Sequence, residues 1–164
     1  MKKILISLVV VVALAGIGLW QFSGSAKVAP DVTFTTLSGE KVTTQDLRGK
    51  VVLVKFWATS CVTCIQQMPD TIKTYNDLAP KGYEVVAVAM DYDPPAYVKN
   101  YTETRKLPFK VAMDSQGDIA KAFGNVQLTP TAFLIDKQGH IIKRYLGNYD
   151  TAAFLKTVQN ALSS

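Results

Sequence analysis

Apolar and polar positions divide the chain into a leading segment and a longer remainder. The run from residue 4 to residue 20 has 17 residues and no charged side chain, and Lys2 and Lys3 precede it. A cleaved signal peptide has an apolar core of about 7–15 residues, whereas a membrane-spanning helix needs about 17–25. Residues 1–26 are therefore predicted to form an N-terminal transmembrane or signal helix.

Two features bear on whether this segment is cleaved. Trp20 closes the apolar run where an aromatic interface residue would lie, which favours an uncleaved single-pass anchor. Gly24, Ser25 and Ala26 offer small residues for cleavage, so a cleaved periplasmic form is the alternative. The basic residues at the start hold the amino terminus in the cytoplasm in both cases. We therefore expect the remainder on the periplasmic, extracytoplasmic side of the cytoplasmic (inner) membrane.

Beyond residue 26 the pattern predicts strands that alternate with helices in one domain, residues 27–164. Residues 51–58 form an apolar run interrupted only by Lys55, which fits a strand buried on both faces. Residues 61–78 carry apolar side chains at three- and four-residue spacing, which predicts a helix with Pro69 inside it. Other predicted elements are a hairpin (32–34 and 41–43), a helical turn (44–47), strands (83–90, 109–111, 132–135 and 141–145) and helices (94–104, 118–123 and 151–162, the last capped by Asp150). The alternation predicts an α/β fold, a three-layer α/β/α sandwich around a central mixed sheet, with residues 23–30 as a tether.

The charge distribution argues against a nucleic-acid partner. The chain has 18 basic and 13 acidic residues, a formal charge of +5. Removing Lys2 and Lys3 leaves 16 basic residues and a charge of +3, and these residues are scattered, with no tract longer than a pair. Nucleic-acid sites usually concentrate basic side chains on one face.

The two cysteines, Cys61 and Cys64, lie three residues apart. A structural disulfide stabilises mainly by closing a long loop, and this one closes almost none. A structural zinc site needs four ligands, and only His140 is available to add to the two thiolates. Asp91 and Asp93 are predicted to be turn and cap residues rather than a metal site. Redox chemistry remains, with the Cys61–Cys64 disulfide itself as the redox group and no other cofactor or metal.

The position of the pair suggests different tasks for its members. Cys61 follows a buried strand and begins a helix, where unpaired N–H groups and the helix dipole favour a thiolate. Cys64 lies one turn further along the same helix face and is better shielded. We predict that Cys61 attacks a partner disulfide and that Cys64 resolves the resulting mixed disulfide.

The sequence around the cysteines resembles a known family. The segment 54–64, Val-Lys-Phe-Trp-Ala-Thr-Ser-Cys-Val-Thr-Cys, resembles the active site of thioredoxin-like proteins, and more narrowly that of membrane-anchored TlpA/ResA-type thiol–disulfide oxidoreductases. The resemblance continues through 83–88, an insert at 91–106 and the segment 128–135, Leu-Thr-Pro-Thr-Ala-Phe-Leu-Ile. It covers most of the chain from about Ala29. It implies a thioredoxin-like fold.

The resemblance also implies further site residues. It implies a cis peptide bond between Thr129 and Pro130 beside the cysteines, where backbone groups pair with an extended substrate. From the residues alone, a trans proline that opens a strand is the alternative. The resemblance places Trp57 beside the active site and, with Thr129 and Pro130, among the substrate-binding residues, whereas the bare residue is typical of a core.

Lys55 departs from the family pattern, in which thioredoxins have a buried acid and related exported proteins often have a neutral amide. A charged Lys55 beneath the pair would stabilise a thiolate, and a desolvated, neutral Lys55 would accept the proton of Cys64. The alternative is a side chain whose stem lies along apolar surface while its head reaches water. Both interpretations remain open on the sequence alone.

The leading hypothesis for function is an extracytoplasmic thiol–disulfide oxidoreductase that reduces or exchanges disulfides of exported proteins. An integral membrane electron carrier would supply the electrons, and by family analogy the targets include apocytochrome c cysteines during cytochrome c maturation. One alternative is a peroxiredoxin-like thiol peroxidase, although Ala58 stands where those proteins usually have Thr, three residues before the reactive cysteine. Another is a non-enzymatic Cu(I)-binding chaperone that uses the two thiolates.

Overall fold

The computed structural model describes residues 27–164, so the predicted anchor or signal helix lies outside the described residues. The strands are β1 (Lys27–Val28), β2 (Thr33–Thr35), β3 (Lys41–Thr43), β4 (Val51–Trp57), β5 (Tyr83–Ala89), β6 (Lys110–Met113), β7 (Thr131–Ile135) and β8 (His140–Leu146). The helices are α2 (Val62–Leu78), the 3-10 turn η1 (Ala79–Lys81), α3 (Pro95–Thr104), α4 (Asp118–Ala122) and α5 (Thr151–Ser163). These bounds agree with the predicted elements to within one or two residues, apart from the two regions considered below.

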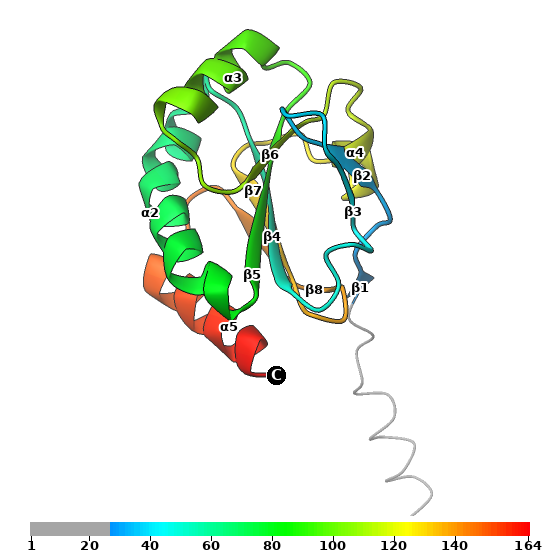
Figure 1. The fold of residues 1–164 in the computed structure, drawn as a ribbon, viewed down its shortest axis with the longest axis vertical. Coiled ribbons are helices and arrows are strands. Elements are labelled where there is room, and N and C mark those ends of the chain that lie inside the picture. Colours follow the sequence, from blue (N-terminus) through cyan, green and yellow to red (C-terminus); the bar gives the residue numbers. More distant parts are fainter. Residues whose placement is uncertain (1–26) are drawn as a thin grey trace, which may run out of the picture.

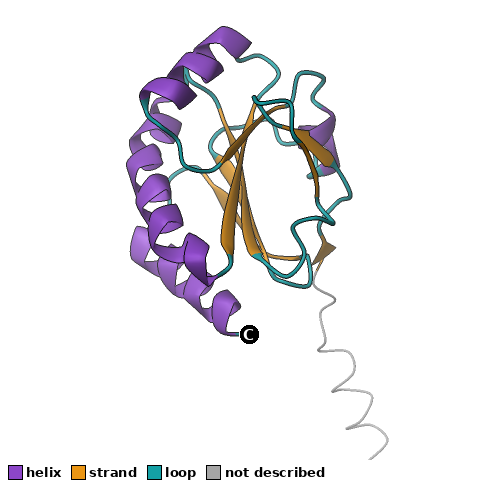
Figure 2. Ribbon diagram, viewed as in Figure 1, coloured by secondary structure: helices purple, strands orange, loops and turns teal. Residues whose placement is uncertain are grey.

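The elements form three layers, as predicted (Figure 1). Helices α2, α3 and α5 cover one face of the central sheet, and the β2–β3 hairpin with α4 lies on the other face (Figures 1 and 2). The central sheet has six strands in the order β1-β8-β7-β4-β5-β6. It is mixed, because β4, β5 and β6 are parallel while β7 runs antiparallel to both β4 and β8.

Strand β4 occupies the middle of the sheet, and all seven of its residues are buried. It pairs with β5 on one side and with β7 on the other. Its side chains alternate between the two faces, because successive strand residues point in opposite directions. Val51, Leu53 and Trp57 join the core under the helices, while Val52 and Phe56 join the core under the hairpin and α4. Pairing and burial therefore fix the end of β4, from which the chain continues to Cys61.

Two regions differ from the predictions. Lys27 and Val28 lie within the predicted tether, but they form β1 and pair with His140 and Ile141 of β8. Both residues of β1 are exposed, so no burial pattern marks this edge strand in the sequence. The predicted helical turn at 44–47 is instead a series of hydrogen-bonded turns. Within residues 27–164 there is no helix with the length and apolar character needed to cross a membrane.

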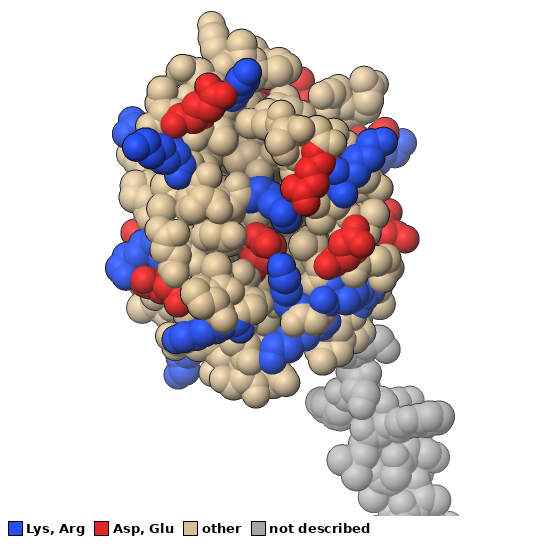
Figure 3. Space-filling view, in the orientation of Figure 1, with Lys and Arg blue, Asp and Glu red and all other residues tan. Residues whose placement is uncertain are grey.

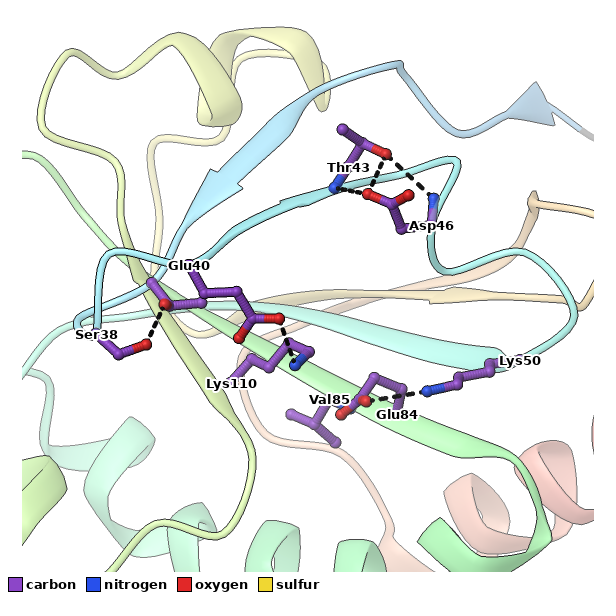
Figure 4. Close-up of polar contacts among 9 residues, drawn as sticks. Ser38, Glu40, Thr43, Asp46, Lys50, Glu84, Val85 and Lys110 are labelled. Atoms are coloured by element: carbon purple, nitrogen blue, oxygen red, sulfur yellow. Dashed lines mark hydrogen bonds and ion pairs between the residues drawn. The ribbon is translucent and has the colours of Figure 1, made fainter.

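Polar contacts close a turn on the hairpin side of the domain and join that side to the sheet (Figure 4). The carboxylate of Asp46 accepts hydrogen bonds from the backbone N–H and the hydroxyl of Thr43, which closes the turn after β3. Lys110 of β6 pairs with Glu40 beside the hairpin at 3.4 Å. On the face drawn in Figure 3, basic and acidic side chains are interspersed in the upper part, and several basic side chains lie close together along the lower edge.

Helix boundaries follow local capping interactions. The Asp150 carboxylate accepts a hydrogen bond from the N–H of Ala153 at 2.6 Å, which confirms the predicted cap of α5. The residue that precedes α3 is Pro94, which makes no side-chain cap. The predicted cap role of Asp93 is therefore wrong.

Asp93 instead fixes the loop that leads from β4 to the cysteines. Its side chain is buried, and its two carboxylate oxygens accept hydrogen bonds from the N–H and the hydroxyl of Thr59, each at 2.6 Å. Thr59 lies two residues before Cys61. Because Asp93 follows β5 and Thr59 follows β4, this contact holds together the loops at the ends of two neighbouring strands.

Replacing Asp93 by Ala removes both acceptors and leaves two donors of Thr59 without partners. We expect the free energy of unfolding to fall by about 2 kcal/mol, measured by urea denaturation of the disulfide-bonded protein. Asp91→Ala is the matched control, because Asp91 is exposed in the same loop and its loss should change stability by less than about 0.5 kcal/mol. Equal stability of the two variants would contradict this role for Asp93.

Candidate active site

Cys61 and Cys64 form a disulfide at the start of α2, with their Cα atoms 5.2 Å apart. Cys61 is the N-cap residue of the helix, and its sulfur accepts a hydrogen bond from the N–H of Cys64 at 3.2 Å. Cys61 is half-buried, whereas Cys64 has no exposed surface. The sequence-based placement of the pair, at a strand end and a helix start, is confirmed.

In this geometry the two sulfurs differ in their accessibility to a partner protein. A sulfur at the N-cap faces the unpaired N–H groups of the first helical turn, which stabilise negative charge. Cys61 combines that position with partial exposure, and its neighbour Val62 is 69% exposed. Cys64 is reached only through the bond to Cys61. The arrangement is suited to attack by Cys61 and resolution by Cys64.

The loop before β7 is the one that the family resemblance places beside the cysteines. The peptide bond between Thr129 and Pro130 is cis, as the family resemblance implies. The Pro130 carbonyl accepts a hydrogen bond from the N–H of Gly147 at 2.8 Å. The Thr129 hydroxyl contacts the Tyr92 hydroxyl at 3.3 Å, and Leu128 is 64% exposed. Thr129 and Leu128 therefore present side chains to solvent, while Pro130 is buried.

Gln67 connects this loop region to the helix. Its side chain is buried one turn after Cys64, and its Nε2 donates to the Gly147 carbonyl and to Asn148 Oδ1, both at 3.1 Å. Gly147 in turn donates to Pro130. Two successive hydrogen bonds thus link α2 to the cis-proline loop.

Lys55 lies on the helix-facing side of β4 and has no exposed surface. Its Nζ donates to Gln67 Oε1 at 3.0 Å and to Thr71 Oγ1 at 3.1 Å, and lies 5.9 Å from the ring centre of Tyr149. Burial lowers the pKa of Lys55 to about 8, while the charge of Asp70 opposes the shift. The interpretation in which the Lys55 head reaches water is therefore wrong, because the helix covers the whole side chain.

Trp57 belongs to the core. Its side chain has no exposed surface, and its ring packs against Tyr101 with ring centres 5.4 Å apart. The backbone carbonyl of Trp57 accepts from Met90, which ties the end of β4 to the end of β5. This burial agrees with the core interpretation and gives no support to the predicted contact between the Trp57 side chain and a substrate.

Three residues near the cysteines were not assigned to the site from the sequence: Gln67, Asp93 and Tyr149. The signal that points to Gln67 is the lysine in an otherwise apolar strand, because a buried ammonium needs acceptors on the element that covers it. Asp93 precedes two prolines, and an aspartate in that position is typical of turns and helix caps. The local sequence therefore did not indicate its contact with Thr59. Tyr149 follows β8 in a loop whose path the sequence pattern does not predict.

Comparison with known proteins agrees with this site. The sequence model of the Redoxin family matches residues 23–162. The thiol–disulfide oxidoreductase ResA of Bacillus thuringiensis subsp. konkukian is 40% identical over 121 residues, which cover 74% of this chain and 69% of ResA. The thioredoxin-like protein YneN of Bacillus subtilis is 35% identical over 151 residues, 87% of each chain.

A solved structure shows the same fold. The crystal structure of a thiol:disulfide interchange protein of the thioredoxin family from Chlorobium tepidum superposes with a TM-score of 0.78 at 28% identity. The superposition covers 85% of this chain and 99% of that one. The chain therefore belongs to the Redoxin family and is a ResA/TlpA-type, thioredoxin-like thiol–disulfide oxidoreductase.

Proposed function

We propose that Cys61 and Cys64 exchange electrons with disulfides of exported proteins on the outer side of the cytoplasmic membrane. The observation that carries the proposal is a half-buried sulfur at the helix N-cap joined to a fully buried sulfur one turn later. Only the half-buried sulfur of such a pair is accessible to a partner disulfide. A partner therefore meets Cys61 first.

The exchange has two steps, written here for the reduced enzyme. The Cys61 thiolate attacks a partner disulfide, which forms a mixed disulfide and releases one partner sulfur as a thiolate that takes up a proton. Cys64 then loses its proton and attacks Cys61, which releases the second partner sulfur. Two electrons pass to the partner, which becomes a dithiol, while the enzyme disulfide forms again.

The cis-proline loop is proposed to hold the partner during the first step. Thr129 and Leu128 are accessible to solvent in the loop before β7, and Val62 is exposed next to Cys61. These residues would contact an extended segment on either side of the partner cysteine. Pro130, which is buried, would act through the backbone of the loop rather than through its ring.

The location is proposed from the leading segment of the sequence. Lys2 and Lys3 followed by 17 uncharged residues favour export of the domain, with the segment retained as an anchor or cleaved. Cytosolic reductants do not reach that side of the membrane, so an integral membrane carrier is the proposed electron source. Cysteines of apocytochrome c, which must be reduced before haem attachment, are the proposed substrates.

Replacing either cysteine tests the assignment of roles. Cys61→Ser should reduce disulfide reduction, measured with insulin and a chemical reductant, to the rate without enzyme. Cys64→Ser should retain the first attack and accumulate the mixed disulfide, because the resolving sulfur is absent. Mass spectrometry of the trapped species should place the partner on Cys61.

Ser60→Ala serves as the control for this pair of variants, because Ser60 is exposed beside Cys61 and carries no redox group. Its activity should match that of the unaltered chain. If Cys61→Ser forms stable mixed disulfides on Cys64 as fast as Cys64→Ser forms them on Cys61, the proposed division of roles is contradicted.

Labelling in spheroplasts tests the location. We expect a membrane-impermeant maleimide, added after mild reduction, to modify the cysteines of the full-length chain in intact spheroplasts. A chain that starts at residue 27 is the control and should stay protected until lysis. Recovery of the labelled chain with the spheroplast membranes supports the anchor, and recovery of the chain in the periplasmic fraction released during spheroplast formation supports cleavage. Protection of the full-length chain contradicts export.

A further inference from the structure

Lys55 is a buried cation whose direct partners are neutral. Its two hydrogen bonds go to an amide oxygen of Gln67 and a hydroxyl oxygen of Thr71, both on α2. A buried charge without a charged partner is costly, which is why burial lowers the pKa of Lys55 to about 8. The ammonium group therefore gains free energy from any negative charge that develops in its surroundings.

The hydrogen bonds place the ammonium on the same side of the helix as the buried cysteine. Gln67 and Thr71 follow Cys64 by three and seven residues, so all three lie along one face of α2. At a rise of about 1.5 Å per residue, their Cα atoms lie roughly 4.5 Å and 10.5 Å beyond that of Cys64 along the axis. The Lys55 ammonium, held between Gln67 and Thr71, therefore lies about one to two turns beyond Cys64 along the buried face of α2.

The other groups that face Lys55 leave this charge largely unopposed. On the neighbouring strands its register partners are Ala87 and Ala132. From the loop after β8 it faces Tyr149, whose pKa burial raises to about 12, so the phenol is neutral at physiological pH. Asp70 of α2 is the acidic group that affects Lys55, and its residue is exposed to solvent.

A small hollow gives solvent a route to this network. It has a volume of about 180 Å³ and is lined in part by Gln67, Asp70, Asn148 and Tyr149. The lining includes one hydrogen-bond partner of Lys55 and the ring above its ammonium. A polar hollow of this size accommodates several water molecules, so water can reach Gln67 and Tyr149, which both contact Lys55.

We propose that Lys55 is a positioning residue for the second step of the exchange, in which its ammonium stabilises the thiolate of Cys64. The proposal rests on the function proposed above. A thiol with no exposed surface loses its proton at a cost, because the thiolate is poorly solvated. A cation on the buried side of Cys64 lowers that cost. Cys61 faces the N–H groups of the helix instead, so the first step depends less on Lys55.

The proposed step balances as follows. The Cys64 thiol releases its proton to water, and the resulting Cys64 thiolate is stabilised by the positive charge of the protonated Lys55. The thiolate attacks the Cys61 sulfur of the mixed disulfide, and the bond from Cys61 to the partner breaks. The partner sulfur leaves as a thiolate and takes up a proton. No further oxidant or reductant takes part.

The reaction of the reduced full-length chain with dithiobis(nitrobenzoate) separates the two steps, because each step releases one coloured nitrobenzoate thiolate. In Lys55→Met, stopped-flow absorbance should show an unchanged first release and a second release slowed about tenfold near pH 7. The difference in the second rate between Lys55→Met and the unaltered chain should shrink as the pH rises. At high pH the Cys64 thiol is deprotonated by base, so the cation no longer changes the fraction of thiolate. Lys73→Met, the same change at an exposed site on α2, should leave both rates unaltered.

Thr71→Val keeps Lys55 but removes one acceptor, which disfavours the ammonium form. This milder variant should slow the second release by a smaller factor, with the same dependence on pH, and it tests the proposal if Lys55→Met does not fold. A second release with equal rates in all variants, or a slowing that is the same at every pH, would overturn the role of Lys55. Absence of the first release in the unaltered chain would instead overturn the proposed function.

Discussion

The site depends on the burial of β4, which is paired with a strand along each edge and covered on both faces. This constraint leaves the end of the strand little freedom, and the Asp93–Thr59 contact removes more of it in the loop that follows. The chain then enters α2 at Cys61. The reactive sulfur thus owes its place to a central strand, while its chemistry comes from the helix start. Rigid elements hold reacting groups more accurately than loops do.

The same strand brings a lysine beneath α2, and buried neighbours surround its side chain. Alanines on both neighbouring strands flank it, and a buried amide and a hydroxyl accept its hydrogen bonds. The side-chain oxygen of Gln67 accepts a hydrogen bond from this ammonium, and its side-chain nitrogen donates one to the loop after β8. An amide suits this position because it both accepts and donates. The buried charge and the cis-proline loop are therefore parts of one hydrogen-bonded network.

Hydrophobic periodicity predicted most of the fold, because the strands and helices of this domain bury long apolar runs or stripes. The cysteine pair was recognisable from two residues and their spacing, whereas the cis bond before Pro130 required the family resemblance. Strand β1 escaped prediction since both of its side chains are exposed. Asp93 and Gln67 escaped because their partners lie 34 and 80 residues away in sequence, at Thr59 and Gly147. Local patterns do not encode such contacts.

The reduction potential of the cysteine pair, its redox poise, depends on the positive charge near each sulfur. A disulfide is neutral, so a group that stabilises a thiolate favours the reduced form and makes the pair more oxidising, by about 30 mV for each 1.4 kcal/mol. Val62 and Thr63, between the cysteines, contribute no cation. The helix N-terminus acts on Cys61, and the proposed effect of Lys55 acts on Cys64. Under this proposal the reduction potential is set in part from the buried face of α2, by a residue with no exposed surface. Because Gln67 and Gly147 link Lys55 to Pro130, a change at Lys55 also reaches the loop that is proposed to hold the partner.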